Sequence, residues 1–536
     1  MAKKYANPED YLRTDHLDDD IGRRTVRGGA ITSIAQAMKS ILQIASTLAL
    51  ARLLTPEDFG LVAMVTAVTG FLGMFKDMGL AMVTIQRKKI THKQVSALFW
   101  INAAIGLVIT LLVIGLSWGL VWFYEQPEVF GIAIVLSLSF MVSGLTVQHV
   151  AIMKRQMRYR DLALVEVISM GLGLGVAVAM AWQGFSYWAL VANMVVYAAA
   201  HFIGMWIACR WRPALSVGAE GLWDLLVFGW HLTGFSLINY FARNLDDVLI
   251  GRFHGAGELG LYQKAYEILM VPIRQINAPA SRVAIPALSR LADQPERYRR
   301  AYRRILEKLL LVTMPLGALL IVAADWIVLV VLGDQWVDAA VIFAFLGISI
   351  FAQAIGNTTG WLFISQDRTK DMFKWGFIGS GTAIVSFIIG LPWGAVGVAL
   401  AYSVVGITIR TPWLLWYVGR KGPVKTRDFY ATAWPPFVAA LGAGAGLWLF
   451  REFAAFQWPL LNLVLSVPIT VLCLLAVTAI LPQGRAILAD VMVLVGHLRK
   501  KKEEQGQDGD VDKKGREARL REIIAGDDNT TDEDEQ

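Results

Sequence analysis

The chain has 536 residues, of which 56% are hydrophobic and 17% are charged. A soluble domain carries about a quarter charged residues, so this composition argues against a soluble protein. The net charge of +7 does not indicate nucleic-acid binding, because Lys and Arg lie between apolar stretches rather than on one face. Cys209 and Cys473 have no paired spacing, which argues against a disulfide framework, a zinc site or a thiol redox motif.

Apolar stretches long enough to cross a bilayer, which takes about 20 residues, follow one another along most of the chain. They predict an all-α integral membrane protein with about fourteen transmembrane helices. The expected spans are 29–53, 59–85, 95–123, 129–152, 161–182, 186–208, 224–251, 258–281, 309–332, 338–364, 372–391, 394–417, 432–450 and 458–481.

Positive charge gathers in every second hinge between the spans. The basic hinges are 23–27, 87–93, 154–160, 210–212, 290–308, 368–374, 420–427 and 499–502. The other hinges offer only Arg52, Arg252 and Arg451. Because Lys and Arg are retained on the cytoplasmic side, both termini are expected in the cytoplasm.

The two ends of the chain are polar. Residues 1–28 carry no cleavable signal peptide and are expected to be a cytoplasmic segment before a retained first helix. Residues 483–536 are expected to form a cytoplasmic, mostly disordered tail that begins basic, contains a short helix near 516–524 and ends acidic.

A short block occurs twice, at residues 51–61 and 251–261. Arg52 matches Arg252, Asp58 matches Glu258, and Gly60-Leu61 matches Gly260-Leu261. Each block joins the first and second helix of a six-helix unit, and both units begin on the same side of the membrane. This arrangement favours a parallel repeat whose axis lies along the membrane normal, with two lobes around a cavity. The alternative is that the block is only a good turn between two helices.

Three stretches resemble the polysaccharide flippases, of the Wzx type, in the multidrug/oligosaccharidyl-lipid/polysaccharide exporter superfamily. The first reads Arg52-Leu-Leu-Thr-Pro-Glu-Asp-Phe-Gly60, and the second runs from Asp77 to Gln86. The third begins Asn244-Leu-Asp-Asp-Val-Leu-Ile-Gly251 and continues through Gly260-Leu-Tyr-Gln-Lys-Ala-Tyr266 to Ile285-Pro-Ala-Leu-Ser289.

The resemblance implies an N-lobe at 29–210, a C-lobe at 211–419 and an additional helix pair at 428–482. It implies alternating access in a bacterial plasma membrane. It also implies a lipid-linked oligosaccharide, usually on undecaprenyl diphosphate, that moves from the inner to the outer leaflet for exopolysaccharide, capsule or O-antigen synthesis. Neither a cofactor nor a metal site is expected. A coupling cation, H⁺ or Na⁺, and a glycan polymerase are the further partners considered.

Charged and amide side chains inside the spans are the candidate site residues, because such groups usually face a cavity. The expected substrate pathway comprises Gln36, Lys39, Gln43, Asn239, Arg243, Lys264, Gln353 and Asn357. The candidates for ion coupling or charge pairing are Asp246, Asp247 and Glu267.

Each candidate has an alternative reading. Lys39 attracts a diphosphate or carboxylate of the substrate, or it packs against an acid of another helix. Arg243 binds phosphate or pairs with a neighbouring acid, and those acids are also candidates for a proton or cation site. Lys264 and Glu267 are three residues apart, so they can neutralise each other. Gln353 and Asn357 bond sugar hydroxyls or join helix to helix.

Two other functions stay open from sequence. A membrane glycan polymerase or ligase needs a positioned acid, base or phosphate clamp, and the short outer loops show none. A small-molecule exporter of the same superfamily suits twelve spans better than fourteen.

Overall fold

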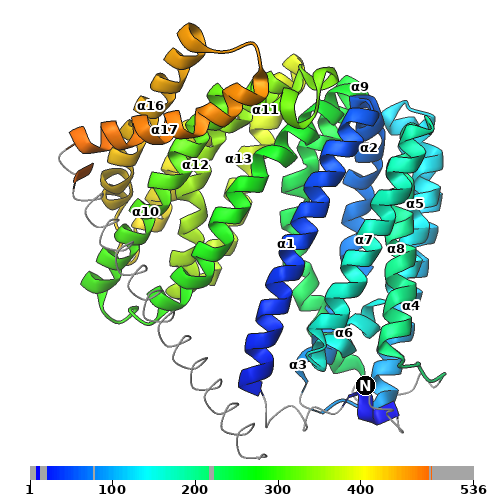
Figure 1. Cartoon of the computed structure of the whole chain (residues 1–536). Coiled ribbons are helices and arrows are strands. Elements are labelled where there is room, and N and C mark those ends of the chain that lie inside the picture. Colours follow the sequence, from blue (N-terminus) through cyan, green and yellow to red (C-terminus); the bar gives the residue numbers. More distant parts are fainter. Residues whose placement is uncertain are drawn as a thin grey trace, which may run out of the picture.

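A computed structural model gives the fold of the chain (Figure 1). It describes residues 8–12, 21–76, 79–87, 89–215, 222–481 and 484–485, and omits the side chains of 8, 10, 21–27 and 222–243. Every element in this part of the chain is helical. Asp77 and the expected C-terminal tail, apart from residues 484–485, lie outside the described residues.

The N-terminal half is built from α1–α8 and two short 3₁₀ turns. Its elements are η1 (Pro8–Tyr11), α1 (Ile21–Leu53), α2 (Pro56–Gly73), η3 (Met74–Lys76), α3 (Leu80–Gln86), α4 (His92–Tyr124), α5 (Glu128–Gly144), α6 (Val147–Arg155), α7 (Tyr159–Trp182) and α8 (Trp188–Cys209).

The C-terminal half is built from α9–α15. Its elements are α9 (Leu222–Ser289), α10 (Pro295–Val322), α11 (Ala324–Val331), η4 (Asp334–Trp336), α12 (Ala339–Ser365), α13 (Thr369–Gly390), η5 (Leu391–Trp393), α14 (Gly394–Val405), the π-helical turn η6 (Gly406–Arg410) and α15 (Thr411–Gly419). A final pair follows, α16 (Thr426–Ala454) and α17 (Pro459–Ile480).

The α9 segment is two antiparallel helices. Gly255 has φ 83° and ψ −177°, outside the helical region, and divides the 68 residues. Tyr262 Oη donates to Asp246 Oδ2 at 2.8 Å, and Gln263 Nε2 donates to Asp247 Oδ2 at 2.9 Å. Partners sixteen residues apart on both sides of the glycine require the chain to turn back. The expected hairpin between the seventh and eighth spans is therefore present.

Eleven helical segments of the described chain are long and apolar enough to cross a membrane. One of them, 369–419, has 51 residues and is interrupted at Gly394, where φ is 69°. The α9 hairpin is not among the eleven. The protein is thus a multi-pass helical membrane protein, and the count of fourteen spans stays a prediction.

Two expected spans are interrupted. The second contains η3 and α3 after α2, and the fourth divides into α5 and α6. Interrupted backbone at membrane depth needs buried polar partners. A series of hydrogen bonds from buried side chains supplies these polar partners. Thr84 Oγ1 donates to Gln148 Oε1 at 2.7 Å, Gln148 Nε2 donates to Asn102 Oδ1 at 2.9 Å, and Asn102 Nδ2 donates to the Lys76 carbonyl at 3.0 Å.

The two ends of the bundle are named here after the expected orientation. In Figure 1 the α1–α2 junction and the turn of α9 lie together at the upper end, which we call the outer end. The N-terminal η1 lies at the lower, inner end. The expected outer hinges therefore meet at one end of the bundle.

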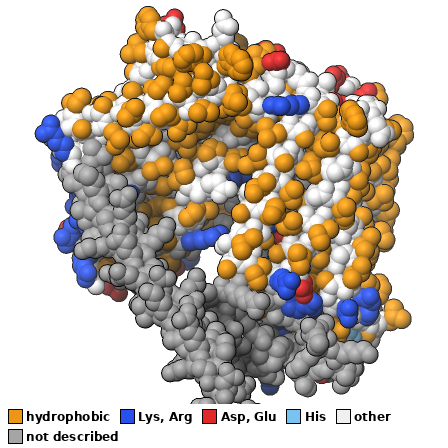
Figure 2. All heavy atoms as spheres, in the orientation of Figure 1, with side chains coloured by type: hydrophobic (Ala, Val, Ile, Leu, Met, Phe, Trp, Pro, Cys, Tyr) orange, Lys and Arg blue, Asp and Glu red, His pale blue; other side chains and the backbone are white. Residues whose placement is uncertain are grey.

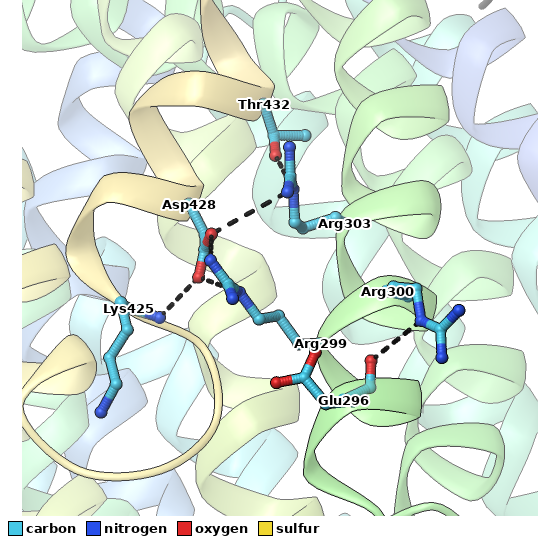
Figure 3. Close-up of polar contacts among 7 residues, drawn as sticks. All are labelled: Glu296, Arg299, Arg300, Arg303, Lys425, Asp428 and Thr432. Atoms are coloured by element: carbon cyan, nitrogen blue, oxygen red, sulfur yellow. Dashed lines mark hydrogen bonds and ion pairs between the residues drawn. The ribbon is translucent and has the colours of Figure 1, made fainter.

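The C-terminal pair is fixed to the C-terminal half at both ends. At the inner end, Arg299 of α10 forms two hydrogen bonds with Asp428 of α16, at 2.8 and 2.5 Å (Figure 3). At the outer end α16 supplies the arginine instead of the acid, and Arg451 of α16 pairs with Asp325 of α11 at 2.8 Å. The carboxylate of Asp428 is 4% exposed and that of Asp325 is 32% exposed.

The hydrophobic cores show how the halves meet. The largest cluster contains residues of both halves, among them Met64 and Leu259, and includes the outer ends of several helices. Towards the inner end each half has a separate core. One contains Leu80, Phe99 and Trp211, and the other contains Tyr302 and Phe363. The described buried residues therefore form one shared core at the outer end, whereas each of the two inner clusters of described residues belongs to a single half.

Candidate functional site

Helix α1, which carries the predicted polar stripe, borders a recess between the two halves (Figure 1). Figure 2 shows this hollow, with Lys or Arg side chains inside it. Gln36 and Gln43 are exposed. Lys39 Nζ lies 2.7 Å from Glu166 Oε2 of α7, and their side chains are 31% and 36% exposed. Lys39 therefore has the partner acid that the alternative reading required, while one side of the pair stays open.

The acids of α9 lie closer to the outer end. Asp246 is 8% exposed and bonds to Tyr262, but its Oδ1 atom is buried with no hydrogen-bond partner among the described residues. Asp247 bonds to Gln263. The side chains of Asn239 and Arg243 lie outside the description, so the expected pairing of Arg243 stays a prediction.

Lys264 lies at the contact between the halves. Its Nζ atom is 2.7 Å from Glu267 Oε2, so these two charges neutralise each other. The same atom lies 4.3 Å from the centroid of the Phe59 ring of α2, at cation–π distance. Phe59 in turn packs edge-on against Trp336 at 5.4 Å. Lys264 is therefore enclosed between the halves in this structure.

The amides of α12 do not join the charged groups in a single cluster. Gln353 Nε2 donates to Ser349 Oγ of the same helix at 2.9 Å, and Asn357 is exposed. The predicted residues thus fall into separate sets: the Lys39 pair, the acids of α9, the enclosed Lys264 pair and the α12 amides. All of these assignments to substrate or ion binding stay predictions.

The repeated block forms the contact between the halves at the outer end. A Cβ atom on Gly60 would lie 1.7 Å from the Ala256 carbonyl oxygen, and one on Gly260 would lie 1.8 Å from the Pro56 carbonyl oxygen. The two contacts are related by the same shift of 200 residues as the block itself. Only glycine allows this approach of the backbones, which explains why both copies carry it.

The repeated arginines also cross between the halves. Arg52 Nη2 donates to the Val330 carbonyl at 3.0 Å, near the hinge before α12. Arg252 Nη2 lies 2.9 Å from Glu125 Oε1, in the hinge before α5. Trp336 Nε1 donates to the Ala51 carbonyl at 2.7 Å and completes the contact. We call this set, with the two glycines, the outer latch.

The repeated acids stay within their own halves. Asp58 accepts a hydrogen bond from Ser186 Oγ in the turn between α7 and α8. Glu258 accepts one from the Ala395 N–H at 2.8 Å, in the corresponding turn between α13 and α14. Asp58 also closes a capping box with Thr55 at the start of α2. The repeated glycines, arginines and acids therefore contact corresponding regions of the two halves, although the partner groups differ, which supports the duplication.

Sequence reasoning missed Glu166, Tyr262, Gln263 and Trp336. Glu166 was detectable, since it is an acid inside the apolar span 161–182 and the rule that identified Lys39 applies to it equally. Tyr262 and Gln263 were detectable too, since they lie in the third stretch that carries the family resemblance, whereas Trp336 lacked a signal, because Trp is common near span ends.

Comparisons with known proteins agree with this architecture. The family model described as "Polysaccharide biosynthesis protein" matches residues 49–341, more than half of the chain. The teichuronic acid biosynthesis protein TuaB of Bacillus subtilis is 28% identical over 85% of this chain and 95% of its own length. The lipopolysaccharide biosynthesis protein WzxC of Escherichia coli is 27% identical over 78% of this chain and 86% of its own.

A solved structure shares the fold. The lipid II flippase MurJ in an inward closed conformation superposes with a TM-score of 0.66, at 16% identity, over 84% of this chain and 98% of its own. With the family match over more than half of the sequence, the chain belongs to the polysaccharide biosynthesis protein family.

Proposed function

We propose that this protein is a flippase that moves a lipid-linked oligosaccharide from the inner to the outer leaflet of the bacterial plasma membrane. The observation that carries this proposal is the asymmetry of packing between the halves. They share one core and a latch at the outer end, whereas each has its own core at the inner end. This packing is expected of a carrier whose inner end is open to the cytoplasm and whose outer end is closed.

Transport then proceeds by alternating access, with both termini cytoplasmic. The polar headgroup enters the recess beside α1 from the inner side, while the lipid chain stays in the bilayer. The halves rock, the inner ends close and the outer latch separates. Because both repeated blocks contribute a glycine contact and an arginine contact to the latch, its opening must separate both sets.

The names of the relatives support the class of substrate. Teichuronic acid, lipopolysaccharide and succinoglycan are glycans, and the relative from Rhizobium meliloti, ExoT, is named as a succinoglycan biosynthesis transport protein. A lipid-linked intermediate such as an undecaprenyl diphosphate glycan fits a recess with a lysine at membrane depth. The protein acts as a transporter rather than an enzyme.

Asp246 and Asp247 are the candidate site for a coupling cation. Asp246 is buried and Asp247 is partly buried, and their negative charges repel each other, so a proton or a metal cation bound at either carboxylate relieves that repulsion. The unpartnered Oδ1 atom of Asp246 leaves one acceptor for such a cation. Asp246→Asn is expected to abolish any dependence of transport on a proton or sodium gradient, measured in vesicles with imposed gradients.

Locking the latch tests the alternating-access step. Arg252→Cys and Glu125→Cys in a background without Cys209 and Cys473 place two thiols across the closed outer end. A short bifunctional thiol reagent is expected to stop transport, and a reducible version of it should restore transport on reduction. Unchanged transport in the fully cross-linked protein would contradict the opening of this end.

A further inference from the structure

The Lys39–Glu166 pair lies within two segments, Gly28–Leu53 and Tyr159–Trp182, that are long and apolar enough to cross a membrane. Lys39 is eleven residues beyond Gly28 on α1, about 16 Å along the helix at 1.5 Å per residue. Glu166 is seven residues beyond the start of α7, about 10 Å along it. Both groups are partly exposed, and a charge turned towards lipid is costly. A charged pair at this depth is therefore expected to turn its open side to the hollow beside α1 (Figure 2).

Two polar side chains of α8 sense the charge of Glu166. Tyr197 and His201 of α8 stack at 5.7 Å with an interplanar angle of 20°. The negative charge of Glu166 acts electrostatically on both residues. A tyrosine hydroxyl and an imidazole N–H are donors to a carboxylate. Tyr197 and His201 therefore lie in the electrostatic field of Glu166, on the helix next to its own.

Lys39 has spare donor capacity. An ammonium group has three N–H donors, and one of them is used by Glu166 in this structure. The carboxylate keeps the empty recess neutral, which avoids a lone ammonium at membrane depth. A diphosphate brings more negative charge and more acceptor oxygens than a single carboxylate, so it competes well for the same lysine.

We propose that Glu166 is an internal counter-ion of Lys39 that an anionic group of the substrate, a phosphate or a carboxylate, must displace. This inference rests on the proposed function, since it assigns how that recess selects its cargo. Once displaced, the Glu166 carboxylate would accept hydrogen bonds from Tyr197 and His201. A cargo without a phosphate or carboxylate group cannot displace it. Glu166 is therefore a specificity-determining residue that makes binding depend on the charge of the cargo.

The test measures binding of farnesyl diphosphate, a short polyprenyl diphosphate, to the full-length protein in lipid nanodiscs. E166Q removes the competing charge and is expected to tighten binding about tenfold, which is about 1.4 kcal/mol. K39M is expected to weaken binding, and adding E166Q to K39M should give no further tightening. The coupling between the two substitutions distinguishes competition for Lys39 from a general change of charge.

Asp161 provides the matched control. It lies on the same helix as Glu166, five residues earlier, and pairs with Arg158 at 2.5 Å. D161N removes the same charge from α7, so its dissociation constant should stay close to that of the wild type. Glu166→Ala serves as a second variant if E166Q does not fold, because alanine has the highest helix propensity and adds no polar group of its own at this partly exposed position.

The outcomes separate this inference from the proposed function. Unchanged or weaker binding in the Glu166 variants, tightening that persists without Lys39, or equal tightening in D161N would each overturn the counter-ion role. Transport assays of the wild type decide the flippase function independently. A protein that shows the exchange in binding but moves no lipid-linked glycan would retain the counter-ion and lose the proposed function.

Discussion

The reciprocal glycine contacts of the outer latch allow a specific perturbation of the conformational equilibrium. In Gly60→Ala the new Cβ would lie 1.7 Å from the Ala256 carbonyl oxygen, whereas real Cβ contacts essentially never fall below 3.0 Å. The two backbones must therefore separate by about 1.3 Å at this point. Because the neighbour is backbone, no side-chain rotation relieves the contact.

The energetic cost follows from overpacking, which is typically about 1–3 kcal/mol. Since about 1.4 kcal/mol is a factor of ten, the latched state should lose between about fivefold and a hundredfold of its population relative to an outward-open state. Gly260→Ala should act in the same direction. The double variant should cost less than the two separately, because opening the contact once relieves both clashes.

The assay is the distance between spin labels on Glu128→Cys and Asp338→Cys, two exposed positions at the outer starts of α5 and α12, in a background without Cys209 and Cys473. Longer distances are expected in both glycine variants. Gly119→Ala is the control, since a Cβ there meets nothing within 4 Å. An unchanged distance in folded Gly60→Ala protein would refute the reasoning.

Three further predictions concern charged groups. Lys39→Ala should weaken transport more than Lys39→Arg in a cell-based assay, because the charge in the recess is what binds the cargo. Glu125→Arg combined with Arg252→Glu should restore transport lost in either single variant; the pair is exposed and worth at most about 1 kcal/mol, so each loss should be modest. Asp428→Asn should lower the melting temperature by more than Asp325→Asn, because the Asp428 carboxylate is 4% exposed and the Asp325 carboxylate is 32% exposed.

Contrary results are easily recognised for these three. Equal effects of the two Lys39 variants would mean that the charge is not the relevant property. Failure of the reversed pair to restore transport, while the protein is folded and inserted, would remove that ion pair from the latch. A larger destabilisation by Asp325→Asn would show that the outer end, not the inner end, fixes α16.

The spans were predictable because apolar length and glycine position are local properties. The expected ends of α12 at 338–364 agree with Ala339–Ser365, and the glycine-rich block at 251–261 contains the turn at Gly255. The repeat was predictable for the same reason. The contacts made by the repeat could not be predicted, since the sequence does not show that Gly60 lies against Ala256 and Gly260 against Pro56.

Features set by distant partners could not be predicted. The interruption of the second span depends on Asn102 and Gln148, whose amides are remote in sequence. The helix expected to begin at 309 begins at Pro295. The segment before 309 is mostly basic, but Tyr298, Tyr302 and Leu306 form a buried apolar stripe on one face of it, which holds it in the helix. Lys39 was identified as a candidate, but its partner on α7 was not.

Leaflet-resolved analysis of polyprenyl-linked oligosaccharides, in cells with and without this protein, tests the central claim most directly. The lipids are extracted, identified by mass and probed with a glycan-modifying enzyme added from outside. The flippase proposal predicts that a completed lipid-linked unit accumulates, shielded from that enzyme, only when the protein is absent. Normal exposure of the unit in those cells, with a change only in glycan chain length, would contradict the proposal and favour a polymerase.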